Sequence, residues 1–328
     1  METFTPDNPD RPAVHVVIPT HTPRYLDLVL AAIALQTAAP ASVVVACDTD
    51  DPAIADLVDT VWPQLADAAA SRDQSVPRLV HVGRPHQGEA RLNQNRNNGL
   101  RTLEKMVRPG ERDLVVFVDG DTLLAEDAID RYQVLASEGT ELVIPYRIDL
   151  DRETSEALCL DDILRGDRPL GHLATARAYE RLEVRERRYT RQLRQREGLE
   201  QRVGLIKPHK PKVLGGHHAV SVGRLRAVNG FDERYTGWGF DDDELARRLH
   251  AMRPAPRCAI AVRTILAFHI WHESRAPKRL SDSPGYRLFN ERPFPRLAER
   301  GWARPVDQPE PTAREVLPAS IGTATPRA

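Results

Sequence analysis

The chain has 328 residues, enough for one large or two small domains with a substantial core. Its 41% hydrophobic and 28% charged residues are typical of a soluble globular protein, and a formal net charge of -1 gives no overall reason to expect nucleic acid as a partner. The N-terminus lacks a basic segment followed by an apolar one, and no apolar run approaches the length of a membrane span. We therefore expect a cytoplasmic protein without a transmembrane segment.

The N-terminal region alternates apolar runs with segments of helical spacing. The pattern predicts a strand at 14–18, a helix at 25–36 and a second strand at 42–46, which is the order of a right-handed parallel β-α-β unit. Ligands of such units bind beyond the strand ends, where Asp48 lies in an acidic cluster. Asp48 can therefore hold the base or ribose of a nucleotide, or it can merely start the next helix, predicted at 52–65.

A third strand, predicted at 78–82, precedes a segment rich in amides. Residues 88–100 have the length of a helix but include four asparagines, which are weak helix formers. Either these amides bind backbone and ligand polar atoms, or the helix is simply exposed.

A Val-rich run at 114–118 ends in Asp119-Gly120-Asp121. The run predicts a buried strand, and Gly120 allows the backbone to bend sharply after it. Two carboxylates at the carboxyl edge of a central strand suit a divalent cation that also carries phosphate oxygens. The alternative is a polar turn that caps the next helix, predicted at 125–137; a further strand is predicted at 141–146.

The segment from 149 to 212 is dominated by charge. Residues 177–202 carry Arg or Glu at nearly every second position, and opposite charges three and four apart support a solvated helix. Because glutamates neutralise much of the basic charge, a surface helix in an inserted subdomain or acceptor lid is favoured over a nucleic-acid-binding arm.

The C-terminal part carries an aromatic and acidic motif. A Gly-Gly turn at 215–216 leads into a strand, a short helix is predicted at 224–228, and Trp238 between two glycines precedes four acids that open a helix. The helix dipole favours one or two carboxylates in a first turn, but four in a row repel one another. This excess indicates a catalytic role beyond capping, in which one Asp is made more basic by its neighbours.

A last strand, predicted at 259–268, leads into His269 and His272. Imidazoles three residues apart at a strand end can place one or both rings on a metal. Together with a carboxylate pair elsewhere, His272 is consistent with a mixed oxygen and nitrogen site. Beyond Trp302 the chain is rich in Pro, Ala and Thr, which predicts a disordered tail.

These motifs resemble those of a known family. Four of them fall in the order seen in GT-A glycosyltransferases of the family 2 type: Val17-Ile18-Pro19-Thr20, the acidic end of the second strand, Arg96-Asn97-Asn98-Gly99-Leu100 and Asp119-Gly120-Asp121. Residues 215–249 resemble the C-terminal catalytic module of the β-1,4-galactosyltransferases, and 269–275 are similar to its metal-binding end.

The resemblance implies an α/β fold of the GT-A type, a mostly parallel sheet flanked by helices with a charged helical insertion. A flexible N-terminus at 1–12 would precede one domain at 13–305, and a disordered tail would follow at 306–328. The domain would comprise a nucleotide-binding half at 13–148, the insertion at 149–212 and an acceptor and catalytic module at 213–275.

The resemblance also implies the donor site. Asp121 would bind Mn²⁺ or Mg²⁺ at the diphosphate of a UDP-sugar, with His272 as a further ligand, and Asp119 would face the ribose or the metal. His269, at a position often occupied by Met in the galactosyltransferases, is another candidate ligand. The residues that would hold the uridine are Thr20, Asp48 and Arg96.

On the acceptor side, the resemblance makes Asp242 the base that takes a proton from the acceptor hydroxyl as it attacks the anomeric carbon. Trp238, Asp241 and Asp243 would shape the acceptor site, with Asp241 standing where the family usually has Glu. The acceptor would be a glycan, a lipid-linked or a small molecule.

We thus expect a metal-dependent, inverting glycosyltransferase that moves a hexose or N-acetylhexosamine from a UDP-sugar to a hydroxyl. The alternatives are a retaining transferase of the polypeptide GalNAc-transferase type and a catalytically silent module that binds nucleotide sugars or glycans. A nucleotidyltransferase would normally carry a Gly-rich phosphate loop after the first strand, and Pro19-Thr20-His21-Thr22 is not one.

Overall fold

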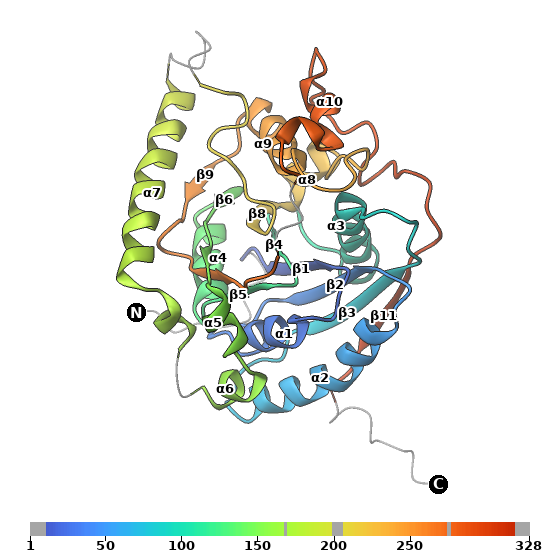
Figure 1. The fold of residues 1–328 in the computed structure, drawn as a ribbon, viewed down its shortest axis with the longest axis vertical. Coiled ribbons are helices and arrows are strands. Elements are labelled where there is room, and N and C mark those ends of the chain that lie inside the picture. Colours follow the sequence, from blue (N-terminus) through green and yellow to red (C-terminus); the bar gives the residue numbers. More distant parts are fainter. Residues whose placement is uncertain (1–10, 167–168, 199–205, 274–276, 319–328) are drawn as a thin grey trace.

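The computed structural model describes residues 11–166, 169–198, 206–273 and 277–318, and its centre is a large twisted sheet (Figure 1). Eight strands lie in the order β11-β3-β2-β1-β4-β8-β6-β9. Four neighbouring strands are parallel: β1 (Val14–Thr20), β2 (Ser42–Asp48), β3 (Arg78–Arg84) and β4 (Leu114–Val118). Every residue of β1, β2 and β4 is buried, which explains their continuous apolar runs.

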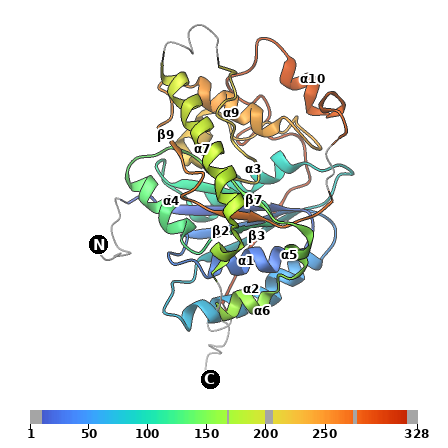
Figure 2. The same cartoon turned by 60° about the vertical axis from the view of Figure 1, so that its left-hand side comes forward.

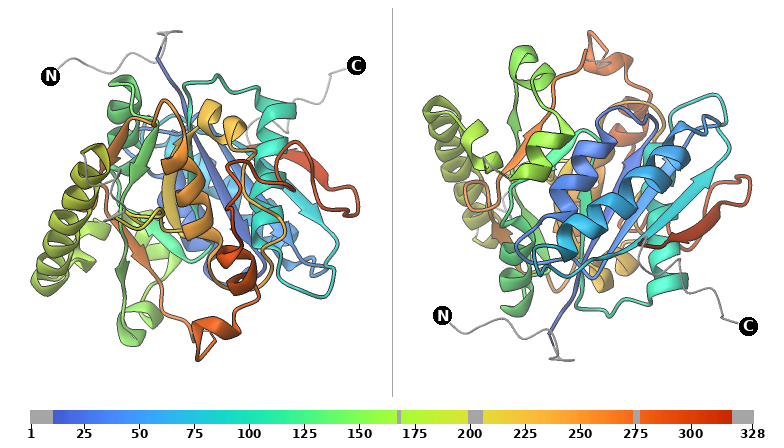
Figure 3. Two further views of the ribbon diagram at one scale, coloured as in Figure 1. Left: turned by 90° about the horizontal axis from the view of Figure 1, so that it is seen from above. Right: turned by 90° about the horizontal axis from the view of Figure 1, so that it is seen from below.

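Helices cover both faces of this sheet (Figure 3). On one face lie α1 (Leu26–Ala34) and α2 (Ala53–Ala70), and on the other lie α3 (Leu92–Thr102) and α9 (Asp241–Ala251). Further helical elements complete the frame: η1 (Leu103–Val107), α4 (Ala128–Ser137), α8 (Val222–Ala227), η4 (Leu280–Asp282) and α10 (Gly285–Asn290). The predicted α/β fold with a mostly parallel sheet between helices is confirmed.

The amide-rich helix α3 is buried, so its interpretation as an exposed helix is wrong. Its asparagines bind backbone carbonyls of other segments: Asn95 Nδ2 donates to Ala46 O at 2.7 Å, and Asn97 Nδ2 donates to Phe231 O at 2.8 Å. Because buried carbonyls need donors, these amides tie the end of β2 to the segment before α9.

A second, three-stranded sheet lies beside the first and positions the histidines. It contains β5 (Thr122–Leu124), β10 (Ala267–His269) and β7 (Ile148–Asp149). The antiparallel register of β5 and β10 pairs Thr122 with His269, and the parallel register of β10 and β7 pairs His269 with Asp149. The imidazole of His269 is thereby brought next to the Asp-Gly-Asp turn.

The predicted single strand at 259–268 is in fact two strands. β9 (Cys258–Ile260) joins the main sheet beside β6 (Leu142–Ile144), whereas β10 belongs to the second sheet. A turn at 262–264 separates them, so one apolar run serves two sheets. Within the main sheet, β8 (His217–Ser221) runs antiparallel to both β4 and β6.

The charged insertion forms helices on the outside of the molecule. Its elements are α5 (Arg152–Glu156), α6 (Leu160–Arg165), η2 (Leu170–Leu173) and α7 (Ala176–Glu197). Figure 2 shows α7 running along the outside of the sheets, and Leu182, Tyr189 and Arg196 are its buried residues. The solvated helix expected at 177–202 is present as far as Glu197, while 199–202 lie outside the described residues. None of the described helices is long and apolar enough to span a bilayer.

The predicted disordered tail is wrong for 306–318. Strand β11 (Thr312–Val316) pairs antiparallel with β3. Arg78 of β3 forms an ion pair with Glu315 of β11, and Arg314 of β11 forms one with Asp59 of α2. The pairing covers an edge of the sheet that would otherwise expose unpaired backbone groups. Residues 319–328 and 1–10 lie outside the described ranges.

Candidate active site

The Asp-Gly-Asp turn lies between β4 and β5, at the carboxyl edge of the main sheet. The register of β4 and β8 places Val118 opposite His217, so the Gly-Gly turn before β8 lies next to Asp119. The amide of Asp119 donates to Gly216 O at 3.1 Å. Two halves of the chain therefore meet at this turn.

Asp121, His269 and His272 lie close enough together to hold a metal ion, and we call these three side chains the metal cluster. His272 Nε2 lies 3.3 Å from Asp121 Oδ2, and His269 Nε2 lies 3.7 Å from Asp121 Oδ1. One ligand atom from each residue lies within 4.8 Å of the other two. A carboxylate oxygen with two imidazole nitrogens is a donor set that fits a first-row divalent ion. Three of the four predicted metal residues are thus brought together, while the fourth, Asp119, lies outside this group and faces Arg96.

The other ring nitrogen of His269 is also held. Its Nδ1 lies 3.2 Å from Asp149 Oδ1, and Asp149 in turn pairs with Arg147 Nε at 3.2 Å. A carboxylate on one nitrogen directs the other nitrogen of an imidazole toward a metal. The hydrogen bond from His269 lowers the pKa of Asp149, and the hydrogen bond to Asp121 raises the pKa of His272.

Arg96 forms the centre of a second group, the arginine cluster, which comprises Arg96, Asp119, Asp241 and Asp242. The Arg96 side chain is 1% exposed, and its Nη2 lies 3.5 Å from Asp119 Oδ1. Its Nη1 lies 3.1 Å from Asp241 Oδ2 and 3.4 Å from Asp242 Oδ1. Its guanidinium also lies 5.1 Å from the centre of the Phe231 ring. Burial lowers the pKa of Arg96, but the three carboxylates more than offset this effect. The predicted contact of Arg96 with uridine is not supported, because Arg96 is buried beneath the acids.

Two carboxyl groups of the arginine cluster, Asp241 and Asp119, have raised pKa values. Burial raises the pKa of Asp241 and the neighbouring Asp242 carboxylate raises it further, to about 7, although Arg96 opposes the shift. Burial also raises the pKa of Asp119, with Arg96 opposing and Asp121 adding to the shift. The cluster therefore contains a carboxyl group that can exchange a proton near neutral pH.

The Gly-Gly turn lies close to two acids of the arginine cluster. A Cβ atom on Gly215 would lie 2.1 Å from Asp242 Oδ1, and a Cβ on Gly216 would lie 2.8 Å from Asp119 Oδ2 and from Arg147 Nη1. Side chains at these positions would displace the acids, so glycine is needed for the close approach. The sequence shows the Gly-Gly pair but not which groups it accommodates.

Thr20 and Asp48 are the last residues of β1 and β2, and a Cβ atom on Gly120 would lie 2.8 Å from Thr20 Oγ1. Thr20 Oγ1 donates to Thr22 O at 2.8 Å, and Asp48 binds Arg84 Nη2 at 2.8 Å and His86 Nδ1 at 3.0 Å. Both side chains are 5% exposed. The alternative role of Asp48, starting α2, falls instead to Asp51, whose Oδ1 accepts from the amide of Ala53 at 2.9 Å.

The aromatic loop before α9 is held by the segment after β10. Ser283 Oγ donates to the carbonyl of Trp238, and Phe240, at φ 70°, packs against Tyr286 and Phe289 of α10. The Trp238 side chain itself is 49% exposed, while Asp243 pairs with Lys212 Nζ at 3.6 Å. An exposed indole beside the acids is a suitable surface for a sugar ring.

Sequence reasoning missed Arg147 and Lys212. Arg147 follows β6 in no recognisable motif, and only its position against Asp119 and Asp149 shows a role at the site. Lys212 precedes the Gly-Gly turn, and its pairing with Asp243 depends on how α9 packs.

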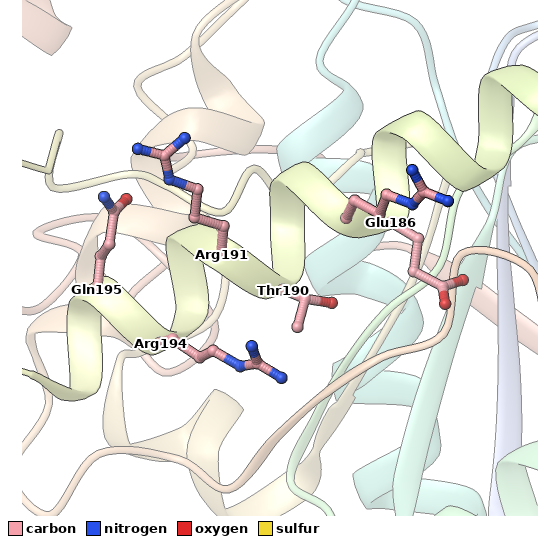
Figure 4. A pocket seen from close by; sticks show the side chains of 6 residues that line it. Glu186, Thr190, Arg191, Arg194 and Gln195 are labelled. Atoms are coloured by element: carbon pink, nitrogen blue, oxygen red, sulfur yellow. The ribbon is translucent and has the colours of Figure 1, made fainter.

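A hollow of about 560 Å³ lies elsewhere, along α7 (Figure 4). Figure 4 shows that its side chains, including Glu186, Thr190, Arg191, Arg194 and Gln195, come from this one helix. None of its lining residues belongs to the metal cluster or the arginine cluster. We therefore place the candidate active site at the strand ends.

Residues 205–255 match the model of a family described as the N-terminal domain of galactosyltransferase. This segment holds the Gly-Gly turn and the acidic start of α9, two of the features that surround Asp119. This segment is therefore similar to a domain of a glycosyltransferase family, in line with the resemblance of the motifs.

Solved glycosyltransferases are similar to this chain at low identity. TarS of S. aureus is 14% identical with a TM-score of 0.44, over 79% of this chain and 37% of TarS. GalNAc-T7 with UDP, GalNAc and Mn²⁺ is 13% identical with a TM-score of 0.46, over 86% of this chain and 48% of that protein. Glucosyl-3-phosphoglycerate synthase from Mycobacterium tuberculosis, in complex with Mn²⁺, UDP and glucosyl-3-phosphoglycerate, is 15% identical with a TM-score of 0.37, over 81% and 73%.

This chain thus spans less than half the length of TarS and of GalNAc-T7. No curated protein sequence matches the chain significantly. At these identities and TM-scores, the solved structures carry no argument about its substrates.

Proposed function

We propose that the chain transfers a hexose or N-acetylhexosamine from a UDP-sugar to an acceptor hydroxyl with inversion, using Mn²⁺ or Mg²⁺. The observation that carries the proposal is the meeting of two different clusters at one strand end. The metal cluster offers ligand atoms for a cation, and the arginine cluster offers carboxylates for proton transfer. Asp119 of the arginine cluster and Asp121 of the metal cluster are only two residues apart.

The donor lies on the side of the metal cluster in this proposal. Asp121, His269 and His272 hold the divalent ion, which when bound neutralises charge on the departing diphosphate. Arg147, next to Asp119, adds a guanidinium that can bind a phosphate oxygen. Thr20 and Asp48 shape the nucleoside end, because they lie at the same edge of the sheet.

The acceptor lies on the side of the arginine cluster. Asp242 accepts the proton of the acceptor hydroxyl while its oxygen attacks the anomeric carbon, and the bond from that carbon to the diphosphate breaks. One displacement inverts the configuration and releases UDP. Trp238 supports the acceptor ring, Asp241 and Asp243 line the site, and Arg96 holds the acids in place.

Calorimetric titration of UDP with and without Mn²⁺ tests the donor half. His269→Ala and His272→Ala should each weaken Mn²⁺-dependent UDP binding by roughly 10- to 100-fold, because each removes a ligand atom. The control is His172→Ala, an exposed histidine of η2, which should bind UDP as the unmodified chain does. Equal UDP affinity in all four proteins would refute the metal site.

A product assay tests the reaction itself. Incubation with UDP-sugars, Mn²⁺ and candidate acceptors should release UDP, and NMR of the product should show an inverted anomeric centre. A retained centre would favour the polypeptide GalNAc-transferase type of mechanism. Pyrophosphate formed from UTP and a sugar 1-phosphate would instead show a nucleotidyltransferase.

A further inference from the structure

We propose that the acceptor carries a phosphate group and that residues 206–212, which we call the lysine loop, bind it. This inference rests on the proposed function, because it names the class of acceptor that the same site takes. The loop contains Lys207, Lys210 and Lys212 and directly precedes the Gly-Gly turn.

The backbone of the lysine loop is held by two helices. Arg196 of α7, 9% exposed, donates from Nε to Lys210 O at 2.8 Å and from Nη2 to Lys207 O at 3.2 Å. His250 Nε2 of α9 lies 2.9 Å from Pro211 O. Because buried groups fix its carbonyls, the loop presents its lysines in one arrangement, which lowers the entropy cost of binding a ligand.

The lysine loop concentrates positive charge. Burial lowers the pKa of Lys210, and the charges of Lys212, Lys207 and Arg188 lower it further, with Asp243 as the opposing carboxylate. Within the described ranges, neither Lys207 nor Lys210 has a carboxylate at ion-pairing distance. A ligand with negative charge would relieve this repulsion.

The position of the loop assigns that ligand to the acceptor. Lys212 Nζ lies 3.6 Å from Asp243, the residue after the proposed base Asp242. The cation on the donor side is a different residue, Arg147, which like Asp119 lies next to Gly216. Among the described residues, no lysine of the loop forms an ion pair with the metal cluster.

A phosphate suits this surface better than a neutral sugar does. A phosphate monoester carries nearly two negative charges at neutral pH, and lysine ammonium groups bind it as point charges. The acids at the start of α9 repel an anion, so the lysines are needed to offset them. The phosphate can belong to a free phosphorylated polyol or to a lipid headgroup, and the two sources are separated by experiment.

The test titrates the full chain with sn-glycerol 3-phosphate and with glycerol, first alone and then with UDP and Mn²⁺. The variant is Lys207→Gln/Lys210→Gln, which leaves Lys212 and the acids intact. The control is Lys105→Gln, an exposed lysine of η1. The double variant should bind glycerol 3-phosphate roughly tenfold more weakly or worse, because two charge-assisted contacts are lost.

A parallel arm uses phosphatidylcholine vesicles with and without phosphatidylglycerol. Binding of the unmodified chain to the phosphatidylglycerol vesicles alone, lost in the double variant, would support the phosphate proposal with a lipid as its source. The proposal is overturned if the unmodified chain binds neither phosphate probe, or if the double variant binds them equally well.

UDP titration of the same proteins separates this inference from the proposed function. Affinity for UDP with Mn²⁺ should stay within roughly twofold in the double variant, because within the described ranges no lysine of the loop forms an ion pair with the metal cluster. A large loss would place the lysines at the donor and overturn the inference. If the unmodified chain showed no Mn²⁺-dependent UDP binding, the proposed function would fail, while the phosphate titration without UDP would still report on the loop.

Discussion

The metal cluster and the arginine cluster share the Asp119-Gly120-Asp121 turn but balance charge in different ways. Asp121 faces two imidazoles, and its side chain and that of His272 are 28% and 38% exposed, so an ion from solvent can reach them. Asp119 faces Arg96, a buried cation that also contacts Asp241 and Asp242. One cluster offers ligand atoms for a cation, whereas the other has a cation built into the protein.

This difference teaches why two acids so close in sequence can have separate roles. Negative charge on a departing diphosphate must be neutralised during the reaction, which suits an exchangeable ion. Acids that position and deprotonate an acceptor must keep one geometry, which suits a packed arginine. Substitutions in one cluster should therefore leave the other largely unchanged.

The largest expected effect is that of Asp242→Asn. Transfer to an acceptor should fall by about 100- to 10,000-fold, because the amide cannot accept the hydroxyl proton. UDP binding with Mn²⁺, measured by calorimetry, should change little because Asp121 and both histidines remain. The exposed Asp127→Asn serves as the control, and normal turnover of Asp242→Asn would show that the base is another residue.

Arg96→Met should have the next largest effect, on stability. Removing the buried cation leaves three carboxylates without their shared partner, which should lower the free energy of unfolding by about 3 to 5 kcal/mol. Urea denaturation at pH 8 measures the change. Arg131→Met, which breaks an exposed pair with Asp127, should cost less than about 1 kcal/mol, and equal losses in both variants would contradict the central place of Arg96.

A smaller effect is expected from Gly215→Ala. The new methyl group must displace the Asp242 carboxylate, so transfer should fall by roughly 10- to 100-fold while the fold and UDP binding are kept. Gly171→Ala is a matched control, because a Cβ there meets nothing within 4 Å. Unaltered kcat in Gly215→Ala would mean that the close approach to Asp242 does not matter.

The smallest expected effect concerns pH and Asp241→Asn. The pKa of Asp241 is raised to about 7 in the folded state, so the native chain holds this proton more tightly than the unfolded chain does. The stabilisation is present below the ordinary pKa of an Asp and is lost as pH rises toward 7. The free energy of unfolding of Asp241→Asn, measured by urea denaturation relative to the unmodified chain, should therefore increase by roughly 2 kcal/mol between pH 5 and pH 8.

Asp127→Asn provides the baseline for that comparison, since its carboxylate is exposed. If the free energies of unfolding of Asp241→Asn and Asp127→Asn changed equally with pH, the burial of Asp241 would have no electrostatic consequence.

Much of the fold could be predicted because its signals are local. Apolar runs indicated the four parallel strands, and the charge spacing at 177–202 indicated the exposed helix α7. The errors came from pairings that depend on distant partners. The run at 259–268 divides between two sheets, and β11 forms only because β3 offers it an edge.

The site shows the same division. Strand ends and histidine spacing indicated Asp121, His269 and His272 as metal ligands, and the structure brings them together, while their binding of a metal stays a prediction. The family resemblance implies a uridine contact for Arg96. Its contact with Asp241 could not be predicted, because the two residues are 145 positions apart and no local pattern links them.

The sequence by itself determined which segments are buried strands and that acids, amides and imidazoles gather at their ends, because hydrophobic periodicity and turn chemistry act over a few residues. Only the tertiary structure decided which charges neutralise one another: Arg96 with the acids, Arg147 with Asp149, and Lys212 with Asp243. Electrostatic energy depends on distance and burial in space, and neither is encoded in separation along the chain.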